Sequence, residues 1–96
     1  MQEIHVDAKN IVNERLFSAD GSNTLFDHIY SQVQSFNSDD SFSVVIDFYS
    51  IDLVSTSFVG RFQEHIVRFK HKYINGKLKI INIKPEIKRQ FTKHST

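Results

Sequence analysis

The order of apolar and polar positions divides the chain into short strands and amphipathic helices. In residues 2 to 17, Ile4 and Val6 alternate with polar neighbours, and a second apolar run begins at Ile11. Alternation with a period of two is typical of half-buried strands. This segment therefore predicts two short strands.

The next apolar pattern has the period of a helix. Residues 24 to 36 place Leu25 and Ile29 on one face, which predicts a helix that buries this face against a sheet. Ser22 or Asn23 precedes the pattern and is expected to cap the first turn.

The centre of the chain predicts a buried strand followed by a long helix. A β-branched run, V-V-I, lies within residues 42 to 48 and is closed by Asp47, which indicates a strand. A loop over residues 49 to 54 follows. Apolar positions then recur with a period of 3.6 and predict a helix from about residue 56 to 73.

This long helix carries a stripe of large apolar side chains. The stripe consists of Phe58, Phe62, Ile66, Phe69 and Tyr73. We expect Phe62 and Ile66 to face the sheet beside Val45, because they lie one turn apart on the apolar side of the helix.

The last part of the chain predicts one more strand and a closing helix. Gly76 is expected to end the long helix in the left-handed conformation. Residues 77 to 83 predict a strand, and Pro85 is placed to open a helix over about residues 85 to 93.

These elements predict one α/β domain that spans residues 1 to 96. Their order is β-β-α-β-α-β-α, with about four strands in a small sheet and helices packed on it. A chain of 96 residues suffices for a single small core.

Three consecutive hydroxyl residues, Ser55, Thr56 and Ser57, stand where the long helix begins. A helix N-terminus has free backbone N–H groups and a positive partial charge, and both favour anions such as a phosphoryl group. The commoner role of Ser or Thr at this place is that of an N-cap. Asp47 and Asp52 flank the preceding loop and are placed to pair with these hydroxyls.

The segment from strand to helix resembles the STAS domain, which bacterial anti-sigma factor antagonists share with the cytoplasmic tails of sulfate transporters. STAS domains carry an apolar strand ending in Asp, a loop, and then Asp-Ser-Ser-Gly-Leu-Gly at a helix start. In this resemblance Asp47 falls on the strand-end acid, Thr56 on the phosphorylated Ser, and Gly60 on the second Gly.

Two positions depart from that motif. Ser55 stands where the motif has Asp, and Phe58 stands where it has the first Gly. The segment is in this respect more similar to the STAS-like family of unknown function, a divergent branch. Residues 77 to 91, K-L-K-I-I-N-I-K-P-E-I-K-R-Q-F, resemble the later STAS strand and the helix after it, and the two matches cover about half the chain.

The resemblance implies a non-enzymatic regulatory module. It implies docking through the loop and helix start at residues 49 to 62 onto a histidine-kinase-like ATPase, which acts as an anti-sigma factor or a serine/threonine kinase. Thr56 and Ser57 are the candidate phosphorylation sites. The residues expected to contact the partner are Asp47, Asp52, Ser55, Thr56, Ser57, Phe58, Gly60 and Arg61.

The distribution of charge leaves a second hypothesis open. Residues 1 to 60 hold two bases and nine acids, whereas residues 61 to 96 hold ten bases and two acids. The two halves are expected mainly to compensate each other within one fold. The alternative is a small nucleic-acid-associated protein that uses the basic region 61 to 93, although no recognition signature for nucleic acid is present.

Several other function classes are disfavoured. The chain has no cysteine, its five histidines include no i, i+4 pair, and its three glycines are isolated. We therefore expect no metal, no cofactor and no enzymatic activity. No apolar run approaches the roughly 18 residues of a membrane span, and the N-terminus is unlike a signal peptide, so we expect no membrane association and a cytoplasmic location.

Overall fold

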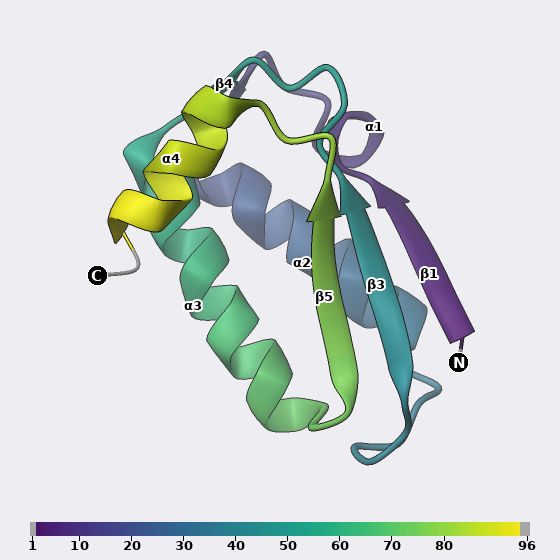
Figure 1. Cartoon of the computed structure of the whole chain (residues 1–96). Helices are drawn as coiled ribbons and strands as arrows, with labels where there is room; N and C mark the ends of the chain where they lie inside the picture. Colours follow the sequence, from purple (N-terminus) through teal and green to yellow (C-terminus); the bar gives the residue numbers. More distant parts are fainter. Residues whose placement is uncertain (1, 95–96) are drawn as a thin grey trace.

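The computed structural model describes the backbone of residues 2–94 and the side chains of residues 2–92. Within these residues the chain forms an α/β fold with a small parallel sheet and four helices (Figure 1). Three strands form the sheet in the order β1-β3-β5: β1 (Gln2–Asp7), β3 (Phe42–Asp47) and β5 (Gly76–Ile81). Two shorter strands, β2 (Leu16–Phe17) and β4 (Leu53–Val54), form a separate parallel pair.

Helices α2 (Ala19–Val33) and α3 (Thr56–Lys72) pack against each other on one face of the sheet (Figure 1). Connections between parallel strands are right-handed, and here the strands follow one another in a single direction across the sheet. Both connections therefore place their helices on the same face. Helix α4 (Pro85–His94) packs against α3, and α1 (Ala8–Val12) contacts β1 and α2.

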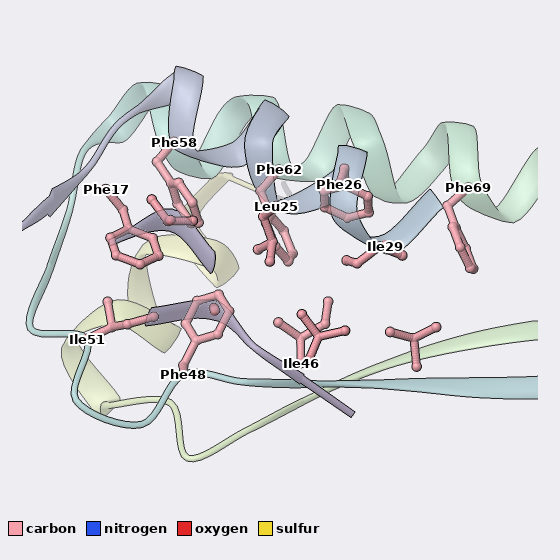
Figure 2. Close-up of a cluster of buried hydrophobic side chains, with 14 of the residues drawn as sticks. Phe17, Leu25, Phe26, Ile29, Ile46, Phe48, Ile51, Phe58, Phe62 and Phe69 are labelled. Atoms are coloured by element: carbon pink, nitrogen blue, oxygen red, sulfur yellow. The ribbon is translucent and has the colours of Figure 1, made fainter. Parts of the chain in front are cut away.

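The core between the sheet and the helices is rich in phenylalanine. Phe58, Phe62 and Phe69 point from α3 toward β3, and Phe48 points back toward them (Figure 2). Phe62 is fully buried, and its ring centroid lies 5.1 Å from that of Phe26 and 5.9 Å from that of Phe48, both edge to face. The prediction that Phe62 faces the sheet is confirmed.

The expectation for Val45 is wrong. Side chains alternate between the two faces of a strand, and Phe42, Val44 and Ile46 are the residues of β3 that belong to the core cluster. Val45 points to the opposite face, although only 4% of it is exposed. Ile66 packs against the core as expected. An uninterrupted V-V-I run carries no alternation, so it could not indicate which residue faces the helices.

The second strand predicted from Ile11 is replaced in part by helix α1. Asp7 caps this helix, because its side chain accepts hydrogen bonds from the backbone and side-chain nitrogens of Asn10. Val12 lies one turn after Ala8, and both are buried. A single helical turn is too short to produce a recognisable period, and only β2 remains as a strand in this region.

Helix α2 begins earlier than predicted, at Ala19, with Ser18 as its N-cap. Ser22 is therefore inside the helix, where it is fully buried and donates a hydrogen bond to the Phe58 carbonyl oxygen at 3.3 Å. Gly21 is buried beside it, and a Cβ there would lie 3.0 Å from Cγ1 of Val12. The small residues that suggested a loop thus allow close packing.

Gly76 does not end α3 in the left-handed conformation, since no described glycine has a positive φ. Tyr73 is the C-cap, and Gly76 is the first residue of β5. A Cβ on Gly76 would lie 2.7 Å from Cζ of buried Phe42. Glycine is needed at this position for space. Strand β5 ends at Ile81, earlier than predicted, because Asn82 adopts φ 56°.

Candidate functional site

The hydroxyl residues lie at the N-terminus of α3, at the end of the sheet where its strands finish (Figure 1). Ser55 is the N-cap, and its Oγ accepts a hydrogen bond from the backbone N–H of Phe58 at 3.0 Å. Its backbone N–H donates to the Phe17 carbonyl oxygen at 2.8 Å, which ties the helix start to β2. The common capping role therefore belongs to Ser55.

Thr56 and Ser57 are both exposed in the first turn. Oγ of Ser57 lies 2.9 Å from Oγ of Ser55 and shares a hydrogen bond with it. The Thr56 hydroxyl makes no hydrogen bond within residues 2–92. The prediction that Thr56 is exposed in the first turn is confirmed, and its hydroxyl, unlike that of Ser57, is not engaged in a hydrogen bond within the described residues.

The charges around this helix start favour an anion. The first turn of α3 contains no acidic residue, so no carboxylate within that turn offsets the positive partial charge of the helix N-terminus. Arg61 is exposed in the next turn and lies 3.6 Å from the Glu64 carboxylate, with about half of each side chain in water. An exposed pair of this kind leaves Arg61 free to contact another group at little cost.

The two aspartates do not pair with the hydroxyls. Oδ1 of Asp47 accepts hydrogen bonds from the Tyr49 backbone N–H at 2.9 Å and from Nδ2 of Asn82 at 3.0 Å. Asp52 forms an ion pair with Lys84. Both acids therefore attach the loop after β3 to the loop after β5, and the expectation that they reach Ser55, Thr56 or Ser57 is wrong for this structure.

Phe58 and Gly60 differ in what they offer to a partner. Phe58 is fully buried, with its ring centroid 5.4 Å from that of Phe17, so its side chain presents no surface to a partner in the folded domain. Gly60 is partly exposed, and a Cβ there would meet nothing within 4 Å. Glycine at this position has no packing role within the described chain.

Sequence reasoning missed an exposed apolar group beside the hydroxyls. Leu16 and Leu53 are direct partners in the β2–β4 pair and remain 49% and 55% exposed. Tyr49, in the loop that leads to β4, is 70% exposed. We call the pair Leu16 and Leu53 the apolar edge. Strands of two residues carry no period, so the pairing of Leu16 with Leu53 could not be inferred from the sequence.

Comparison with protein-family models, with curated proteins and with solved structures found no match for this chain. No helix among residues 2–94 is long and apolar enough to cross a membrane. Within the part of the chain that the structure describes, no group of three or more His, Asp or Glu residues is arranged to hold a metal ion.

Proposed function

We propose that this domain is a STAS-like regulatory module that docks on a partner protein through the helix start of α3 and the neighbouring apolar edge. The observation that carries the proposal is the position of exposed Thr56 next to the exposed pair Leu16 and Leu53. Exposed apolar residues that lie together are typical of interaction surfaces, whereas isolated ones are ordinary.

The loop that carries Tyr49 is well supported, which favours binding without reorganisation. Phe48 and Ile51 anchor it in the core, and a backbone hydrogen bond of 2.9 Å joins the Phe48 N–H to the Ile81 carbonyl oxygen. The contacts of Asp47 and Asp52 with the loop after β5 add to this support. A surface held in its binding conformation loses less entropy when it binds.

The partner that we propose is a histidine-kinase-like ATPase acting as an anti-sigma factor or kinase. This choice rests on the resemblance of residues 42 to 62 and 77 to 91 to STAS domains. In this proposal a phosphoryl group on Thr56 adds up to two negative charges beside the apolar edge and weakens docking by desolvation and repulsion.

The first experiment identifies the partner by co-purification from the native host followed by mass spectrometry, which also reports phosphorylation of Thr56 or Ser57. Affinity for that purified partner is then measured for a Leu16→Ser/Leu53→Ser variant. Ile74→Ser serves as its control, because Ile74 is 68% exposed but follows the other end of α3. We expect the double variant to lose about tenfold or more in affinity and the control to bind normally.

A second pair of variants tests the hydroxyl. Thr56→Glu is expected to weaken docking while the melting temperature stays the same or rises slightly, because an acid in the first turn of a helix is favourable by about 0.3–1 kcal/mol. Thr24→Glu on α2 adds the same charge to another exposed helix position and should bind like wild type. Normal binding of both Thr56→Glu and the double leucine variant would refute docking at this edge.

A further inference from the structure

The face of the sheet opposite α2 and α3 carries no helix within residues 2–94 (Figure 1). Parallel sheets are nearly always covered on both faces. On this open face the side chains form rows across the three strands. Glu3, Ser43 and Lys77 make one row, and His5, Val45 and Lys79 make the next.

The charges on this face are separated by strand. On β1, Glu3 and His5 lie 2.8 Å apart and are more than half exposed. On β5, Lys77 and Lys79 are exposed and form no ion pair with any described residue. The middle of the face is formed by the small residues Ser43 and Val45. Only 4% of Val45 is exposed, so the accessible surface of this face comes mainly from the exposed side chains of β1 and β5.

This arrangement is complementary to itself. Two copies can stack with their open faces together, related by a two-fold axis that runs parallel to β3 and passes above Val45. This axis places β1 of one copy over β5 of the other, and each row of one copy then lies over the same row of the second copy. Glu3 then faces Lys77 of the second copy twice in the dimer, His5 faces Lys79, and the two Val45 residues lie nearest to the axis. The charge complementarity therefore comes from the row of Glu3 and Lys77. An axis perpendicular to the strands would instead place acidic β1 over acidic β1 and basic β5 over basic β5. Like charges opposed in this way are unfavourable.

We infer that the open face of the β1-β3-β5 sheet is a homodimer interface in which acidic β1 of each copy packs over basic β5 of the other. Asp47, the acid of the central strand, lies at the end of this face, and its carboxylate is turned toward the loops by Tyr49 and Asn82. The inference does not depend on the proposed function, because the site at α3 lies on the other side of the sheet.

The size of the face sets the conditions of the test. Three strands of six residues cover roughly 300 Å² per copy at the usual strand spacing and rise. Stable dimers bury about 800 Å² per partner. Association is therefore weak, and sedimentation equilibrium is performed at several hundred micromolar protein, at low and at moderate salt.

A charge exchange tests the geometry. Glu3→Lys alone and Lys77→Glu alone each place like charges opposite each other in both contacts of a homodimer, and each should weaken association by about tenfold. An equimolar mixture of the two variants places each introduced lysine opposite an introduced glutamate. This mixture should associate like wild type.

Glu86→Lys and Lys88→Glu are the matched controls, because they change the same charges at exposed positions of α4. Both should associate like wild type, and higher salt should weaken the dimers of the wild type and of these controls, because it screens the attraction between Glu3 and Lys77. Monomeric wild-type protein under these conditions, failure of the mixture to restore association, or equal loss in the controls would each overturn the inference.

Discussion

Replacement of Gly60 by alanine is expected to stabilise the domain. Gly60 is the fifth residue of α3. Glycine has more conformational freedom in the unfolded chain than other residues, so it loses more entropy when it is fixed in a helix, and it contributes no side-chain contact. The added Cβ would meet no atom within 4 Å, so no packing energy is gained or lost. The change in free energy of unfolding is then the difference in helix propensity, which is about 0.5–1 kcal/mol in favour of alanine.

Gly76→Ala provides the contrast, because its Cβ would lie 2.7 Å from the ring of buried Phe42. This variant should be destabilised by about 1–3 kcal/mol, as is usual for overpacking of a core. In thermal unfolding followed by circular dichroism, Gly60→Ala should raise the melting temperature by about 3–6 °C, and Gly76→Ala should lower it. A lower melting temperature for Gly60→Ala would show that the backbone of α3 is not regular at this residue and would refute the reasoning.

Three further predictions follow from the core, from one histidine and from the distribution of charge. Phe62→Ala, which removes a fully buried ring, should cost about 3–5 kcal/mol in urea denaturation; a loss below 1 kcal/mol would contradict the position of Phe62 in the core. The pKa of His65 is lowered, first by burial and then by Arg68 and Arg61, so the neutral form is favoured in the folded state. The stability that neutral His65 contributes to the folded state is fully present at a pH above its ordinary pKa of 6.5. This stability is lost as the pH falls below that value. The melting temperature should therefore fall more between pH 7.5 and pH 5.5, roughly one unit on each side of that pKa, in wild type than in His65→Gln, and equal falls would contradict this role. DNA and RNA should bind weakly at physiological salt, because Lys77 and Lys79 lie on the opposite face of the sheet from α3; sub-micromolar binding with a steep salt dependence would support the nucleic-acid hypothesis instead.

Local sequence was sufficient for two of the longer elements, whereas helix α2 begins at Ala19 rather than at the predicted residue 24. The strand β3 and the helix α3 begin and end within one residue of their predicted bounds. Each is longer than five residues and has a clear signal: a β-branched run in β3 and an apolar stripe with helical period in α3. The start of α3 after Ser55 could be predicted for the same reason, because a capping residue acts within its own turn.

The candidate site depended more on contacts between distant parts of the chain. Asp47 meets Asn82, and Asp52 meets Lys84, only because β3 and β5 are parallel neighbours whose ends meet at one edge of the sheet. The sequence indicated the two acids, but it contained no sign that these partners would hold them away from the hydroxyls.

The sequence by itself determined where the hydroxyls of Thr56 and Ser57 lie along the chain and that a helix begins there, because these depend on neighbours within a few residues. Only the tertiary structure decided that Leu16 pairs with Leu53 beside them, that Phe58 is buried, and that one face of the sheet stays open. These features depend on strand order and on the direction of the crossovers. Both are properties of the whole fold, and a local pattern of residues does not encode them.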